Sequence, residues 1–183
     1  HGAAFEDTNF EGADLTEAAL GEAKFIRCNF SRAKMPNLDL RTAAFDNANF
    51  SGAEIGGCNF QGSKLIGCKF VRAGMQGTNL DRADLSQADL SHAQLMGARL
   101  TSANLTAANL SGADMTRCSA SEAHFTGADI QGANLRESDF SGARLIAASI
   151  RRAVAWETMQ LRGANVTGLL GAPKGLREYA KQQ

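Results

Sequence analysis

The stretch from Ala83 to Met115, ADLSQADLSHAQLMGARLTSANLTAANLSGADM, places a large apolar residue at every fifth position. These positions are Leu85, Leu90, Leu95, Leu100, Leu105, Leu110 and Met115, and the residue two before each of them is Ala. An amphipathic helix repeats its apolar residues about every 3.6 positions, and a half-buried strand repeats them every 2. A strict period of five fits neither pattern, so it predicts a chain that turns a corner once in each unit.

The same frame runs from Phe5 to Ala155 without an insertion or a deletion, which makes 31 units of five residues. The central residue is Phe, Leu, Ile or Met in 29 units, and all ten Phe of the chain occupy this position. The residue two before the centre is Ala in 22 units. The sequence therefore predicts one large and one small inward side chain in each unit.

The remaining three positions of each unit are mostly polar and are expected to face outward. Asp or Asn directly precedes the centre in 15 units, and Gly is frequent two residues after the centre. Asp and Asn suit turns because their side chains bond nearby backbone amides, and Gly reaches positive φ without a steric cost. We therefore expect a corner with positive φ two residues after the centre.

The consensus A-(D/N)-(L/F)-x-x, as in Ala103-Asn104-Leu105-Thr106-Ala107, resembles the pentapeptide-repeat family over residues 3–157. The resemblance implies an all-β fold, a right-handed quadrilateral β-helix with four units in each coil and about eight coils. Residues 20 apart would then lie above one another. A solenoid of this kind buries its apolar side chains only by stacking, which makes its ends the weak points.

The frame breaks once, at Thr158, and resumes one residue late. The tail from Pro173 to Gln183 has Leu176 and Tyr179 at helical spacing and predicts a short helix that caps the last coil. We therefore divide the chain into a β-helix over residues 1–168, with uninterrupted register over 3–157, and a C-terminal loop and capping helix over residues 169–183.

Charge is balanced overall, with 19 basic and 19 acidic residues, but it is unevenly distributed. Residues 1–25 contain six acidic residues and one Lys, a net charge of −5, whereas residues 141–183 contain seven basic and two acidic residues, a net charge of +5. The rod is therefore expected to be electrically polar along its axis. Either solvated charges are clustered by chance, or they guide a contact at one end over the short range that salt permits.

Residues with reactive or ligating side chains give no pattern for catalysis or cofactor binding. The four Cys (Cys28, Cys58, Cys68 and Cys118) all occupy the small inward position, and on one face the nearest two would lie about 9.6 Å apart, too far for a disulfide. Buried free thiols weakly favour a reducing, cytoplasmic location. His92 and His124 fall on different faces, so we expect no metal site, no cofactor and no enzymatic activity. The sequence also contains no apolar run long enough to predict a membrane span.

Two groups of apolar residues interrupt the polar exterior. Ile26, Ile66 and Ile146 share one face in the four-unit frame, where they are either ordinary exposed residues or a strip for a partner. Near the C-terminus, a second group either caps the rod or pairs it with another copy as a homodimer. The candidate surface therefore contains Ile26, Ile66, Ile146, Trp156, Leu169, Leu170, Leu176 and Tyr179.

Three hypotheses for function remain. Repeat architecture favours a non-enzymatic, protein-binding rod or scaffold with an unknown protein partner and no direct contact with nucleic acid. The family resemblance implies, as an alternative, a bacterial protein of the quinolone-resistance type that imitates DNA and binds a topoisomerase such as DNA gyrase. The neutral charge and the basic C-terminal end depart from that acidic pattern. A third reading is an interaction module of a larger secreted or effector protein.

Overall fold

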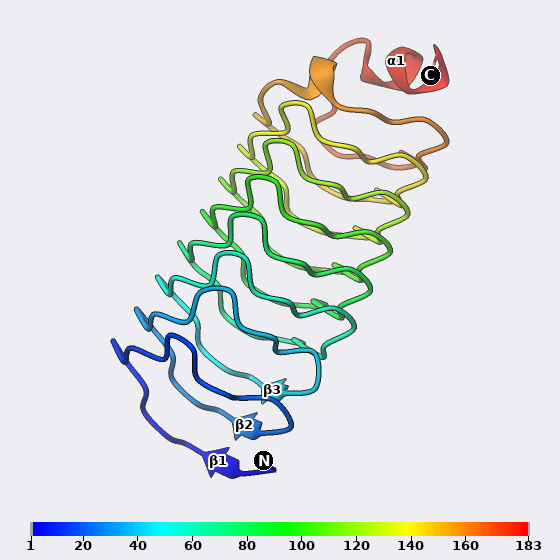
Figure 1. The fold of residues 1–183 in the computed structure, drawn as a ribbon. Helices are drawn as coiled ribbons and strands as arrows, with labels where there is room; N and C mark the ends of the chain where they lie inside the picture. The colour runs from blue at the N-terminus through cyan, green and yellow to red at the C-terminus, as the bar shows by residue number, and fades with distance from the viewer. Residues whose placement is uncertain (1, 183) are drawn as a thin grey trace.

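Coils stack along one axis to form a rod in the computed structural model, which describes residues 2–182 apart from the side chain of Arg177 (Figure 1). The ends of the two expected segments, His1 and Gln183, lie outside the described residues. Parallel bridges join residues 20 apart, from Asn9–Asn29 to Asn134–Val154. Three short strands, β1 (Ala4–Glu6), β2 (Lys24–Ile26) and β3 (Ala44–Asp46), pair in parallel with the same spacing. The chain is a β-helix, as the resemblance to the pentapeptide-repeat family implied.

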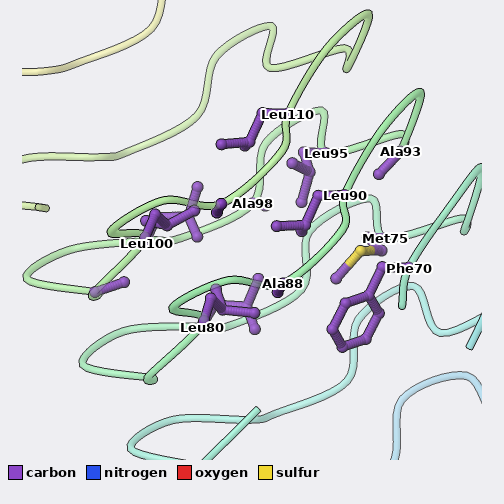
Figure 2. Close-up of a cluster of buried hydrophobic side chains, with 14 of the residues drawn as sticks. Phe70, Met75, Leu80, Ala88, Leu90, Ala93, Leu95, Ala98, Leu100 and Leu110 are labelled. Atoms are coloured by element: carbon purple, nitrogen blue, oxygen red, sulfur yellow. The ribbon is translucent and has the colours of Figure 1, made fainter. Parts of the chain in front are cut away.

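The core consists of the two inward positions of each unit. Every central residue from Phe25 to Ile150 is buried, and the Ala two before each centre pack between these larger side chains (Figure 2). At two buried small positions, Ser63 and Thr78, the hydroxyl donates a hydrogen bond to the carbonyl of a centre 23 residues earlier, as Thr78 Oγ1 does to Ile55 O at 3.1 Å, whereas Ser138 Oγ donates to Leu135 O. Cys58 Sγ approaches Met35 O in the same way. The small position therefore accepts Ser, Thr or Cys because an acceptor is present there.

Corners adopt the expected geometry, but glycine is not required for it. At Leu80, for example, the carbonyl accepts a hydrogen bond of 3.0 Å from Ala83 N, which closes a turn around Asp81 and Arg82. The eleven glycines that lie two residues after a centre have φ between 64° and 71°, as expected. Eighteen other residues have positive φ at the same position, among them Arg82 and Ala107. Closure of the coil imposes this conformation, although it costs a residue with a Cβ roughly 1–2 kcal/mol.

The spacing of the coils changes near their C-terminal end. A 3-10 helix, η1 (Trp156–Thr158), follows Ala155, whose φ is 56°. Beyond η1 the bridged residues are 21 apart, from Asp139–Gln160 to Ser149–Leu170. The next coil therefore contains one additional residue, and stacking continues to Leu170.

One helix, α1 (Leu176–Gln182), lies at the end of the rod opposite β1 (Figure 1). Leu176 is fully buried, and Tyr179 Oη donates a hydrogen bond of 3.0 Å to Met159 O in the last coil. The expectation that the helix starts at Pro173 is wrong. Gly175 has φ of 91°, which a right-handed helix does not allow, so the helix starts directly after it.

Candidate functional site

Outward polar side chains next to the centres bond to one another along the rod. Asn29 Nδ2 donates to Asn9 Oδ1 at 3.0 Å, and Asn49 Nδ2 donates to Asn29 Oδ1 at 3.2 Å. The Asn29 oxygen also accepts a hydrogen bond from the amide of Ser31, which holds the corner. Such ladders fix the spacing of exposed side chains. They also occupy polar atoms that a catalytic site would need.

Groups that bind metals or act as nucleophiles are dispersed or buried. Within residues 2–182, no three His, Cys, Asp or Glu side chains converge in a way that would hold a metal ion. The four thiols are free and buried. Burial raises the pKa of Cys58 to about 11 and the pKa of Cys68 to about 12. These two groups are therefore protonated at neutral pH and shielded from reagents.

The outward face of β2 and β3 forms a mainly apolar hollow, which we call the lysine–isoleucine groove. It has a volume of about 330 Å³. Its lining residues are Lys24, Phe25, Ile26, Ala44, Phe45, Asp46, Lys64 and Ile66. Because alternate residues of a strand face the same side, Lys24 and Ile26 both point outward while Phe25 points into the core.

The groove exists because a small residue separates two long ones. Ala44 lies between Lys24 and Lys64 in successive coils, and its methyl group leaves a gap between the two lysine side chains. Below the gap, Phe25 and Phe45 are almost fully buried and stack at 5.2 Å between ring centroids. Ile66 has 43% of its surface exposed at the opposite wall. The result is a slot floored by the Ala44 methyl group and the strand backbone, flanked by Lys24 and Lys64, with Asp46 and Ile66 along its other side.

Ile26 and Ile66 both line this groove, two coils apart with Asp46 between them, but Ile146 lies away from it. Ile146 occupies the same column four coils later, about 19 Å from Ile66 at the usual strand spacing, and is half-buried. The intervening positions of the column are Ser86, Thr106 and Thr126. An apolar strip that runs the length of this face is therefore absent.

The C-terminal candidates divide into buried and exposed residues. Leu169 and Leu176 are buried within the end of the rod and offer no surface to a partner, which corrects their inclusion in the candidate surface. Trp156 and Tyr179 are half-buried and contact each other edge to face at 6.2 Å. Leu170, with 49% of its surface exposed, is the accessible member of this group.

Sequence reasoning missed the lysines and Ala44, because it examined only apolar residues on the exterior. The signal was present as Lys24-Phe25-Ile26 and Lys64-Leu65-Ile66, two similar triplets 40 residues apart. It also missed Val154, which has 53% of its surface exposed beside the last coils.

Of the six acidic residues at the acidic end, Glu6, Asp7 and Glu11 form ion pairs within the rod. Arg27 contacts Glu6 at 2.6 Å and Asp7 at 2.7 Å, and Arg32 pairs with Glu11. The hydrogen bond from Arg27 lowers the pKa of Asp7. The negative charge predicted for the first coil is thus partly neutralised by arginines of the second coil.

Models of the pentapeptide repeats match residues 103–142 and 121–154, and a model of the pentapeptide repeat region matches residues 3–80. Together they match more than half of the chain. The chain belongs to the pentapeptide-repeat family. A comparison with curated proteins gave no match.

Similar solved structures include one whose TM-score is above 0.5, which supports the same fold. A trypsin-treated variant of QnrB1, a plasmid-mediated fluoroquinolone resistance protein, is 18% identical with a TM-score of 0.55, over 99% of this chain and 92% of that one. HetL, involved in heterocyst differentiation regulation in the cyanobacterium Nostoc, is 20% identical over 92% of this chain and 87% of its own, with a TM-score of 0.37. A thylakoid-lumen protein of Arabidopsis thaliana is 29% identical over 75% of this chain and 71% of its own, with a TM-score of 0.23. Among the described residues of our chain, helices with the length and apolar character of a membrane span are absent.

Proposed function

We propose that this pentapeptide-repeat protein is a non-enzymatic, protein-binding rod or scaffold. The supporting observation is the exterior, where ladders hold exposed side chains at a fixed spacing and one hollow is mainly apolar. Pentapeptide-repeat proteins are generally structural or binding proteins. A rigid face with regular spacing lets a partner dock with little loss of conformational entropy, which favours binding.

Several finer features belong to the same proposal. The rod is right-handed and has about eight coils, as in the family, and α1 caps the last coil through Leu176 and Tyr179. The division into residues 1–168 and 169–183 follows from this role of α1. A homodimer through the C-terminal end would use the exposed surface of Leu170, and no direct contact with nucleic acid is proposed.

The alternative, a DNA-imitating protein that binds gyrase, has less support. Likeness to QnrB1 at 18% identity concerns the fold alone. An imitation of DNA needs continuous negative charge, but Arg32, Arg72 and Arg152 occupy one corner column of this rod. We expect no inhibition of gyrase supercoiling, and no protection from a fluoroquinolone, up to a large molar excess of the protein. Inhibition at stoichiometric amounts would replace our proposal with the gyrase hypothesis.

A direct test uses the four faces of a single coil. Photo-crosslinking amino acids are placed one at a time at the outward positions after four successive centres, which are Ser86, Ser91, Met96 and Thr101. A partner that docks on the rod should crosslink from one face or from two adjacent faces. Equal crosslinking from all four faces, or none from any of them, would contradict a protein-binding rod.

A further inference from the structure

We propose that the lysine–isoleucine groove is the docking site for an extended acidic and apolar peptide segment of a protein partner. One large apolar side chain of the segment lies over Ala44, in the gap between Lys24 and Lys64 and beside Ile66, and flanking carboxylates reach the two lysines. The inference rests on the proposed function, and it adds where the partner binds and what chemistry it presents.

The shape of the groove fits a side chain and not a flat surface. Ala44 opens the floor between the two lysines, and the strand backbone that forms the floor is supported from the core side by the stacked Phe25 and Phe45. Because these rings are already packed in the core, the floor needs no rearrangement when a ligand enters. Burial of an apolar side chain against it is favourable at about 25 cal/mol per Å² of apolar surface.

Charges around the groove favour a carboxylate ligand. Glu6 is paired with Arg27, Asp46 accepts a hydrogen bond of 2.6 Å from Asn47 Nδ2, and Asp84 Oδ1 accepts bonds from Ser86 N and Asn104 Nδ2. By contrast, Lys24 and Lys64 have neither an ion pair nor a side-chain hydrogen bond within the described part of the chain. The neighbouring carboxylates thus already form ion pairs or accept hydrogen bonds, whereas the ammonium groups of Lys24 and Lys64 do neither in that part of the chain.

The distance between Lys24 and Lys64 fits an extended peptide segment of about four residues. Lys24 and Lys64 lie two coils apart, about 9.6 Å at the usual strand spacing. In the polyproline II conformation, residues i and i+3 lie on the same side of the chain and about 9.3 Å apart. A segment with acidic residues at i and i+3 and a large apolar residue between them therefore matches both the two lysines and the gap that separates them.

The test selects ligands from a defined library of displayed decapeptides against the full chain. Selected peptides are synthesised with a fluorescent label, and their Kd is measured by fluorescence polarisation. We expect the acid-x-x-acid spacing with an intervening Leu, Ile or Phe. The double substitution Lys24→Glu and Lys64→Glu should weaken binding at least tenfold, and Ile66→Ser, which keeps the charge, should do so severalfold.

The matched control is Lys34→Glu with Lys69→Glu, which makes the same charge change at exposed lysines of two other faces. It should leave the Kd within about twofold. Selected peptides that lack the pattern, that bind the groove variants normally, or that fail to emerge at all would overturn the inference. If partners still crosslink from one face in that case, the protein-binding rod stands and only the groove is wrong.

Discussion

Aromatic rings stack along the rod in its first half, and Phe50 is one of the rings there with four aromatic contacts. It is fully buried, stacks on Phe30 and Phe70 at 5.1 Å on either side, and contacts Phe45 at 5.1 Å and Phe60 at 6.2 Å edge to face. Phe60 is equally buried and lies in the same part of the rod, but it has edge contacts only, with Phe45 and Phe50. Phe50→Leu and Phe60→Leu therefore remove the same atoms from differently arranged neighbours.

Each aromatic pair contributes about 0.5–1.5 kcal/mol beyond the area that it buries. Phe50→Leu loses four pairs and Phe60→Leu loses two, so the free energy of unfolding should fall by about 1–3 kcal/mol more for Phe50→Leu. With a urea dependence of about 2 kcal/mol per M, the difference in midpoint is about 0.5–1.5 M. Circular dichroism reports the unfolding of the whole rod, and Trp156 fluorescence reports the unfolding of its C-terminal end. Equal midpoints for the two variants would refute the contribution that we assign to stacking.

Three further outcomes are expected. Gly132→Ala should lower the free energy of unfolding by about 1 kcal/mol, because φ is 65° there and strain is the cost when an added Cβ meets nothing within 4 Å. Ala107→Gly, at φ of 57°, should raise the free energy of unfolding. A loss of stability of Ala107→Gly in urea denaturation would contradict our account of the corners. A hydrogen bond from Arg117 lowers the pKa of Glu137 below its ordinary 4.5, so the stability that Glu137 contributes is present above about pH 4.5 and is lost as the pH falls through the lowered pKa. Urea midpoints of Glu137→Gln and the parent should thus differ at pH 7 and converge at low pH, whereas a constant difference would exclude the ion pair as its source. Native protein at pH 8 should resist a thiol-specific reagent that reacts fully in urea, and rapid native labelling would show that burial does not protect three thiols: Cys58, Cys68 and Cys118.

Much of the fold was predictable because each unit repeats the same five-residue pattern. The large centre and the small residue two before it determine which side chains enter the core, and the polar residues between centres indicate where the corners lie, although eighteen of the corners with positive φ have no Gly there. Prediction was weaker at the C-terminal end, where the chain leaves the repeat pattern. The start of α1 depended on the backbone of Gly175, and the burial of Leu169 and Leu176 depended on how the tail folds over the last coil.

By itself, the sequence determined a corner in each unit and the sorting of side chains into core and exterior, because every unit repeats the same five-residue pattern. The 20-residue register was implied by the resemblance to the pentapeptide-repeat family. Only the tertiary structure decided which exterior residues meet. Lys24 and Lys64 are 40 residues apart, and they form one groove because β2 and β3 expose alternate residues and Ala44 leaves the space between. Three coils must stack before such a site exists, so no single unit encodes it.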